Sequence, residues 1–229
     1  MTEGQIMKRL LLLCLCATAW LSAGGQSRDW ADTQRYAAAN AALAVRPKVV
    51  FMGDSITEGW YKEHPGFFDG HGFAARGISG QVTAQMLARF QSDVVALRPR
   101  AVVILAGTND IARNNGPIAD ERIADNIRSM AELARAHGMR VFLCSVLPAA
   151  RYGWRPEVTD APERIERLNG LLRDYARRSG CTWIDFHPAL ADADRALDAR
   201  YTRDGVHPTP AGYDAMEAVV LPYLKRYVR

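Results

Sequence analysis

Four apolar runs rich in β-branched residues alternate along the chain with longer segments in which apolar residues recur every three or four positions. The runs are KVVFMG (48–53), AVVILAG (101–107), RVFLCSVLP (140–148) and CTWIDF (181–186). Continuously apolar runs of this length are typical of strands buried on both faces, and strands that alternate with helices form parallel sheets. The pattern predicts a three-layer α/β/α sandwich. Its central sheet is expected to be mostly parallel and flavodoxin-like, with about five strands, the fifth over FAARGIS (73–79).

The segments between the runs are predicted to be crossover helices. They cover residues 82–97, 119–138 and 162–180, and the last two end in glycine, which is typical of a helix C-terminus. Residues 209–228 predict a C-terminal helix. Because proline removes a backbone N–H, we expect this helix to be interrupted or to end near Pro222.

Residues 1–25 are typical of a secretory signal peptide. Lys8 and Arg9 precede an apolar run, and small residues follow at 23–25. The run is shorter than the roughly 20 apolar residues of a membrane span. We therefore expect cleavage, a periplasmic or secreted protein without a stable membrane anchor, and a single domain over residues 26–229. Retention of the segment as an anchor is the alternative.

Charge and cysteine content limit the partners. The formal net charge is +4, and the basic residues are interspersed with acidic ones, which argues against a nucleic-acid partner. Cys14 and Cys16 lie in the predicted signal peptide, whereas Cys144 and Cys181 lie in apolar runs and are expected to be buried free thiols. No cluster of Cys, His and acidic residues has the spacing of a metal site, so neither a metal nor another cofactor is predicted.

Ser55 stands where the first apolar run ends. In open α/β sheets, ligands bind beyond the carboxyl ends of the strands, so this serine is a candidate nucleophile. A nucleophilic serine needs a base, a carboxylate that orients the base, and N–H donors for an oxyanion. The alternative is that the Ser55 hydroxyl only caps the following helix.

Two Asp/His pairs are candidates for the base. Asp204 precedes His207 by three residues in a glycine-containing loop, so the carboxylate can reach Nδ1 and leave Nε2 free to accept the serine proton. Asp185 precedes His187 by two residues, where either side chain can instead cap a helix or bond within the loop. We favour Asp204 and His207 and retain the second pair as an alternative.

Donors for the oxyanion follow successive apolar runs. The Ser55 amide, the Gly80 amide and the Asn109 side chain each stand just after a predicted strand. Each signal alone is weak, because glycine and asparagine are common in turns. Their occurrence after successive strands favours one shared site.

Four short motifs resemble the sequence blocks of the SGNH hydrolases, also called GDSL esterases and lipases. They are GDSIT (53–57), GISG (77–80), GTND (107–110) and DGVHP (204–208), and they occur in the family's order. Ile56 replaces the leucine of the GDSL motif, a change from one branched apolar residue to another. The residues in and around the second and third motifs, RGISGQ and LAGTND, are most similar to those of secreted bacterial acylhydrolases of the acetylhydrolase type.

The resemblance implies a role for each matching residue. Ser55 would be the nucleophile, Asp204 and His207 would complete the triad, and Gly80 and Asn109 would join the Ser55 amide as oxyanion donors. It further implies a serine esterase that forms an acyl-enzyme on short-chain, acetyl-type esters, with O-acetylated carbohydrates among the candidate substrates. The family does not define the substrate, so small-molecule and carbohydrate esters both remain candidates.

A nucleotide-binding domain is not supported, because neither G-x-G-x-x-G nor a P-loop motif follows the first run. A lysophospholipase or thioesterase acting on lipid acyl groups and a non-catalytic carbohydrate-binding relative remain alternatives. Trp60, Tyr61 and Trp154 lie in segments that are expected to line the site or to cover the edge of the core.

Overall fold

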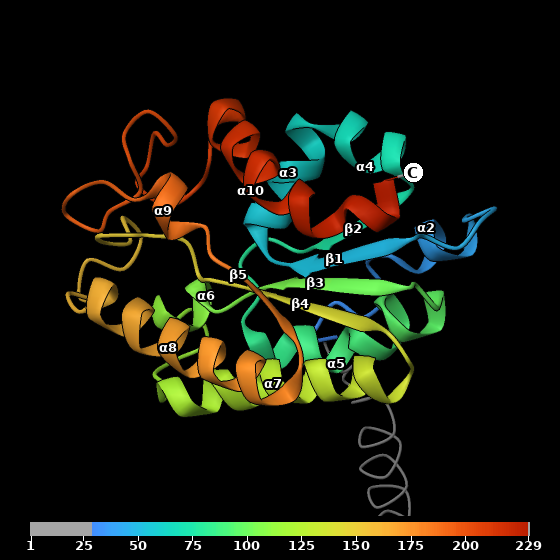
Figure 1. Cartoon of the computed structure of the whole chain (residues 1–229). Coiled ribbons are helices and arrows are strands. Elements are labelled where there is room, and N and C mark those ends of the chain that lie inside the picture. The colour runs from blue at the N-terminus through green and yellow to red at the C-terminus, as the bar shows by residue number, and fades with distance from the viewer. Residues whose placement is uncertain (1–28, 229) are drawn as a thin grey trace, which may run out of the picture. The chain divides into compact units, whose positions relative to one another are not determined.

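The centre of the fold is a five-stranded, entirely parallel sheet (Figure 1). The computed structural model describes residues 29–228, and the described residues from Ala31 onward belong to one compact unit. The predicted signal peptide lies outside the described residues. In the order β2-β1-β3-β4-β5, the strands are β1 (Val49–Gly53), β2 (Phe73–Gly77), β3 (Ala101–Leu105), β4 (Arg140–Cys144) and β5 (Thr182–Ile184).

Helices cover both faces of the sheet, as Figure 1 shows. Those on one face are α3 (Ser55–Glu63), α4 (Pro65–His71), α9 (His187–Leu190) and α10 (Pro210–Val228). Those on the other are α5 (Thr83–Asp93), the 3-10 helix η1 (Val95–Leu97), α6 (Thr108–Ile111), α7 (Asp120–Ala136) and α8 (Ala161–Ser179). A short helix, α2 (Ala37–Ala41), precedes β1 and contacts α5. The predicted three-layer α/β/α sandwich is confirmed.

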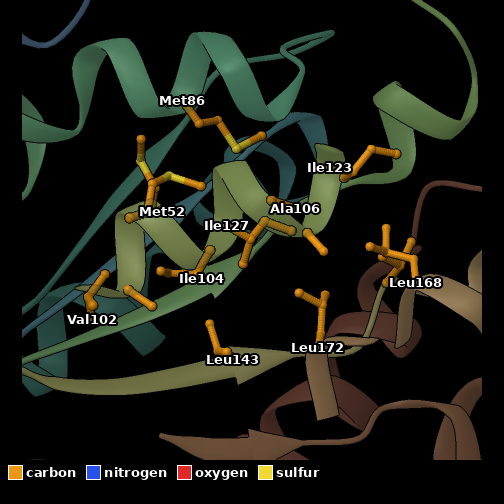
Figure 2. Close-up of a cluster of buried hydrophobic side chains, with 14 of the residues drawn as sticks. Met52, Met86, Val102, Ile104, Ala106, Ile123, Ile127, Leu143, Leu168 and Leu172 are labelled. Atoms are coloured by element: carbon orange, nitrogen blue, oxygen red, sulfur yellow. The ribbon is translucent and has the colours of Figure 1, made fainter. Parts of the chain in front are cut away.

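Alternate residues of each central strand enter different cores. Val50 and Met52 of β1 face the α5, α7 and α8 side, where Figure 2 shows Met52 among side chains of the strands and these helices. Val49 and Phe51 face α3, α4 and α10. Because a strand buried on both faces has no solvent-exposed side, its sequence is continuously apolar.

The register brings three strand ends together. Gly53 at the end of β1 is paired with Gly77 of β2 on one side and with Leu105 of β3 on the other. The chain leaves β1 for β2 and then crosses back to β3, so β1 lies where the strand order reverses. A ligand site is expected beyond the carboxyl ends at this point.

Two predicted boundaries are corrected. Pro222 lies within α10, which continues to Val228, and Val220 and Leu224 on either side of the proline are buried in the core. Packing of this apolar face compensates for the hydrogen bond that proline cannot donate. β5 is shorter than the apolar run at 181–186, because its pairing with β4 ends at Ile184.

The two cysteines of the described region are free, but only Cys144 is buried. Cys181 precedes β5 and is half-buried, so the expectation of two buried thiols is wrong for this residue. Within residues 29–228, no helix combines the length and apolar composition that crossing a membrane requires.

Candidate active site

A tight turn after β1 places Ser55 at the first position of α3. A Cβ atom on Gly53 would lie 2.1 Å from Thr57 Oγ1, so the turn excludes larger residues. Asp54 caps the helix, since its Oδ1 accepts a hydrogen bond of 2.9 Å from the Ile56 amide. Capping is therefore supplied by the aspartate, and the amide of Ser55, at the helix N-terminus, has no intrahelical acceptor.

The Ser55 hydroxyl meets the side chain of His207, 152 residues later in the chain. Ser55 Oγ lies 2.9 Å from His207 Nε2, and His207 Nδ1 lies 2.7 Å from Asp204 Oδ2. An ionised carboxylate can only accept hydrogen bonds, so Nδ1 carries the imidazole proton and Nε2 is the acceptor for the hydroxyl. This is the tautomer that a general base requires.

The Asp204 carboxylate is held in its loop by backbone donors. Oδ1 accepts hydrogen bonds from the amides of Val206 and His207 at 2.9 and 2.8 Å. Partial burial raises the pKa of Asp204, but the hydrogen bonds from the amide and the imidazole of His207 and from the Val206 amide outweigh burial and lower its pKa to about 2. The carboxylate therefore remains ionised across the neutral range.

Further N–H groups stand at the ends of β2 and β3. Gly80 has a φ of +77°, a conformation that favours glycine, and within the described residues its amide donates to no protein acceptor. Asn109 is buried, and its Nδ2 donates to the Gln81 carbonyl oxygen at 3.1 Å. Since an amide NH₂ has two hydrogens, one of those on Asn109 remains for a ligand.

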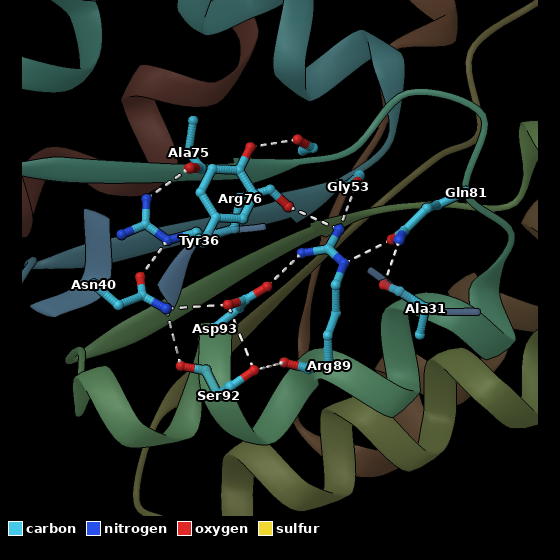
Figure 3. Close-up of polar contacts among 11 residues, drawn as sticks. Ala31, Tyr36, Asn40, Gly53, Ala75, Arg76, Gln81, Arg89, Ser92 and Asp93 are labelled. Atoms are coloured by element: carbon cyan, nitrogen blue, oxygen red, sulfur yellow. Dashed lines mark hydrogen bonds and ion pairs between the residues drawn. The ribbon is translucent and has the colours of Figure 1, made fainter. Parts of the chain in front are cut away.

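Arg89 of α5 ties these strand ends together and was not identified from the sequence. Its side chain is fully buried and donates to the carbonyl oxygens of Gly53 and Arg76 at 2.9 and 3.0 Å (Figure 3). It also donates to Gln81 Oε1 at 2.6 Å and to Asp93 Oδ2 at 2.9 Å. Arg89 and Asp93 are four residues apart on the face of α5 that carries buried apolar residues. This spacing of opposite charges on an apolar face is the sequence pattern from which a buried ion pair could have been predicted.

Asp110, the last residue of the GTND motif, lies in α6 and accepts hydrogen bonds from the first residue of α5. Its carboxylate accepts hydrogen bonds from the amide and the hydroxyl of Thr83 at 2.8 and 2.7 Å. Val82, which precedes α5, has no polar side-chain atom, so Asp110 supplies the cap for this helix. Burial raises the pKa of Asp110 to about 6, although the two bonds from Thr83 act in the opposite direction.

The alternative pair, Asp185 and His187, is engaged elsewhere. His187 Nε2 lies 2.8 Å from the carbonyl oxygen of Val146, which can only accept, so Nε2 carries the proton. Asp185 Oδ1 accepts a hydrogen bond from the His187 amide at 3.0 Å. The His187 bond joins the start of α9 to the loop after β4, and the Asp185 bond is local to the loop after β5, as expected if this pair has a structural role.

The three aromatic candidates differ in position. Trp154 is 42 % exposed, and its ring centroid lies 6.0 Å from that of His207. Tyr61 is equally exposed and packs edge-on against Phe68 of α4. Trp60 is only 1 % exposed and stacks in the core, so its expected place in the substrate site is corrected: α3 directs this indole away from solvent.

In the described part of the chain, one group of three residues has the composition of a metal site. The ligand atoms of His64, Asp214 and Glu217 all lie within 4.8 Å of one another. Glu217 Oε1 accepts hydrogen bonds from His64 Nδ1 at 2.7 Å and from Trp60 Nε1 at 3.0 Å. These bonds connect α10 with the α3–α4 segment, which accounts for the cluster without an ion.

Comparisons with known proteins identify the family. Residues 51–215 match the model of the GDSL-like Lipase/Acylhydrolase family. The crystal structure of a GDSL-like lipase from Bacteroides thetaiotaomicron is 48% identical with a TM-score of 0.82, over 86% of this chain and 98% of that one. Esterase TesA of Pseudomonas aeruginosa is 27% identical over 82% of this chain and 90% of its own length. An acetylxylan esterase of Xylanibacter ruminicola is 26% identical over 58% of this chain and 30% of its own.

The family match extends from β1 to the start of α10 and therefore includes all four sequence motifs. The resemblance seen in the sequence is confirmed. Two of the relatives that align over most of this chain are named as an esterase and as a GDSL-like lipase. This chain therefore belongs to the GDSL-like lipase/acylhydrolase family and is a carboxylic ester hydrolase.

Proposed function

We propose that the enzyme hydrolyses short-chain, acetyl-type esters through a Ser55–His207–Asp204 triad. The observation that carries the proposal is the continuous pair of contacts from Ser55 Oγ to His207 Nε2 at 2.9 Å and from His207 Nδ1 to Asp204 Oδ2 at 2.7 Å. A serine is a weak nucleophile unless an adjacent base takes its proton, and this arrangement supplies that base.

In the first half of the proposed reaction, Ser55 Oγ attacks the ester carbonyl while its proton moves to His207 Nε2. The imidazolium that forms is stabilised by the Asp204 carboxylate. The new oxyanion accepts hydrogen bonds from the amides of Ser55 and Gly80 and from Asn109 Nδ2. When the tetrahedral intermediate collapses, His207 returns the proton to the leaving alcohol oxygen.

The second half repeats these roles with water. His207 accepts a proton from water as the water oxygen attacks the acyl carbon of the ester on Ser55. The same donors hold the second oxyanion, and His207 then returns the proton to Ser55 Oγ as the carboxylic acid leaves.

For the natural substrate we propose O-acetylated carbohydrates. One relative is named as an acetylxylan esterase, and the half-exposed indole of Trp154 beside His207 is suited to stacking against a sugar ring. The other candidate is a lipid acyl ester, which is favoured by the relative named as a GDSL-like lipase. The two differ in the acyl length that the site accepts.

Substitution of the proposed nucleophile tests the mechanism. We expect Ser55→Ala to abolish ester hydrolysis and covalent labelling by a fluorophosphonate, while the circular dichroism spectrum and the urea midpoint remain those of the wild type. The matched control is Ser92→Ala, a serine of α5 that bonds locally to the Arg89 carbonyl oxygen. Hydrolysis by a folded Ser55→Ala protein at the wild-type rate would contradict the assignment.

We further propose that residues 1–25 direct export and are removed, so that residues 26–229 form the mature esterase domain. The two cations, the apolar run and the small residues at 23–25 support this proposal. Intact mass of the protein secreted by the native host would reveal the cleavage site. Recovery of only the uncleaved 25.3 kDa chain would contradict it.

A further inference from the structure

We propose that Asn114 is a positioning residue that orients the Asn109 side chain, and that the indole of Trp154 sets the orientation of Asn114. Neither Asn114 nor this relay follows from the motif residues. The inference rests on the proposed function, because it assumes that Asn109 Nδ2 donates to the oxyanion.

The relay begins at an atom whose role is unambiguous. Trp154 Nε1 can only donate a hydrogen bond, and it lies 2.9 Å from Asn114 Oδ1. The acceptor end of the Asn114 amide is thereby fixed toward Trp154, and the NH₂ end is directed the other way. A flip of this amide would bring two donors together.

The NH₂ end of Asn114 meets Asn109. Asn114 Nδ2 lies 2.7 Å from Asn109 Oδ1 and 3.4 Å from the Gly80 carbonyl oxygen, which can only accept. Asn109 must therefore present its oxygen to Asn114 and its NH₂ group elsewhere. One N–H of that group is held by the Gln81 carbonyl oxygen at 3.1 Å, which leaves the second for the oxyanion.

The backbone supports the same arrangement. The Asn114 amide donates to the Asn109 carbonyl oxygen at 3.0 Å, and Arg113 between them has a φ of +58° in the left-handed region. Asn109 is buried and Asn114 is half-buried, so water replaces the bond between their side chains poorly. Without Asn114, only the Gln81 carbonyl oxygen still distinguishes the nitrogen of the Asn109 amide from its oxygen, so the flipped amide, which would direct an oxygen at the oxyanion, becomes less unfavourable.

The relay also connects the oxyanion donors with the surface that a substrate touches. Trp154 is 42 % exposed and lies beside His207, whereas Asn109 is 3 % exposed. A substrate group that packs on the indole restrains the Trp154 ring. Through Asn114, it then also restrains the Asn109 amide that donates to the oxyanion.

Kinetics of single and double variants test the proposal. Asn109→Ala should lower kcat on the order of 10²- to 10³-fold, as expected for one oxyanion donor. Asn114→Asp, which can still accept from Trp154 but cannot donate to Asn109, should lower kcat by about tenfold or more with KM nearly unchanged. Trp154→Phe, which keeps the ring but loses the N–H, should lower kcat in the same direction by less. Asn115→Ala, an exposed neighbour in the same loop, is the matched control and should behave as wild type.

Non-additivity distinguishes positioning from a separate structural effect. The Asn109→Ala/Asn114→Asp double variant should be no slower than Asn109→Ala alone, because Asn114 acts through the Asn109 amide. If the fold-loss in kcat of the double variant equals the product of the two single losses, the relay is overturned. Wild-type kcat in Asn114→Asp, when Asn109→Ala is slow, would also overturn it. Wild-type kcat in Asn109→Ala would instead refute the proposed oxyanion role, and this inference with it. Urea midpoints of all variants establish that folded proteins are compared.

Discussion

At the scale of single residues, two carboxyls next to the proposed nucleophile have opposite environments. Asp204 lies in a loop where backbone and imidazole donors lower its pKa to about 2 despite partial burial. Asp54 is buried beneath the start of α3, and burial raises its pKa to about 6, although the Ile56 amide and the charge of His207 act in the opposite direction. One carboxyl is thus held ionised, and the other is ionised only at a cost in stability.

Asp204→Asn should lower kcat by up to about 10⁴-fold while the fold and KM are retained. The asparagine can present its NH₂ to Nδ1, which would place the imidazole proton on Nε2 and remove the acceptor for the serine proton. Steady-state kinetics with an acetate ester would measure the loss. Asp185→Asn is the matched control, and its loss should appear in the urea midpoint. The reverse pattern, an inactive Asp185→Asn and an active Asp204→Asn, would move the base to the loop at 185–188.

Asp54→Asn should change how stability depends on pH. Between about pH 4 and pH 6, folded wild-type protein holds a proton on Asp54 that the unfolded chain has lost, so this group makes the wild type less stable as pH rises through that window. Asparagine can still cap α3 but does not ionise. The difference in free energy of unfolding, variant minus wild type, should therefore increase by about 3 kcal/mol from pH 4 to pH 8, because each pKa unit corresponds to about 1.4 kcal/mol. Urea unfolding at pH 4, 6 and 8 measures this, and a difference that does not vary with pH would refute the burial argument.

At the scale of elements, α5 does more than cover the sheet. Met86 and Phe90 of this helix pack in the core, while Arg89 on the same side reaches the carbonyl oxygens of Gly53 and Arg76 (Figure 3). Those carbonyls stand at the carboxyl ends of β1 and β2, where the loops to Ser55 and Gly80 begin. The helix therefore stabilises the edge of the sheet from which the site is built.

Arg89→Met should lower the free energy of unfolding by about 3 to 5 kcal/mol, because it leaves the Asp93 carboxylate buried without its cation. The urea midpoint measures the loss. The double variant Arg89→Met/Asp93→Leu removes both charges and should lose less than the sum of the single variants. Equal stability of Arg89→Met and wild type would indicate that water replaces the guanidinium.

At the scale of the whole molecule, the site depends on contacts between distant parts of the chain. Ser55 follows β1, Asn109 follows β3, and His207 lies in the loop before α10. Parallel strands end at one edge of the sheet, and the reversal of strand order at β1 separates the connections on either side. The proposed donors and the nucleophile can meet only when β1, β2 and β3 have paired.

The proposed substrate class predicts a short-acyl preference. The indole of Trp154, which lies beside His207, remains 42 % exposed, so a long acyl chain placed on it would stay partly in water. Each methylene that is not buried forgoes about 0.8 kcal/mol. We expect kcat/KM on p-nitrophenyl esters to be highest from acetyl to about butyryl and to fall beyond. A steady rise to palmitate would favour the lipid alternative.

The strands and the order of the motifs could be predicted from the sequence alone, and the same sequence was enough to propose the triad. Apolar period and β-branched content follow from burial, and the spacing of Asp204 and His207 is a local property of one loop, so both can be recognised without a fold. Tertiary structure decided what depends on packing between distant segments: the passage of α10 through Pro222, the burial of Trp60, the bonds of Arg89 and the contact of Asn114 with Asn109 and Trp154. A side chain's partners across the sheet are set by strand register and crossover, and no local pattern specifies these.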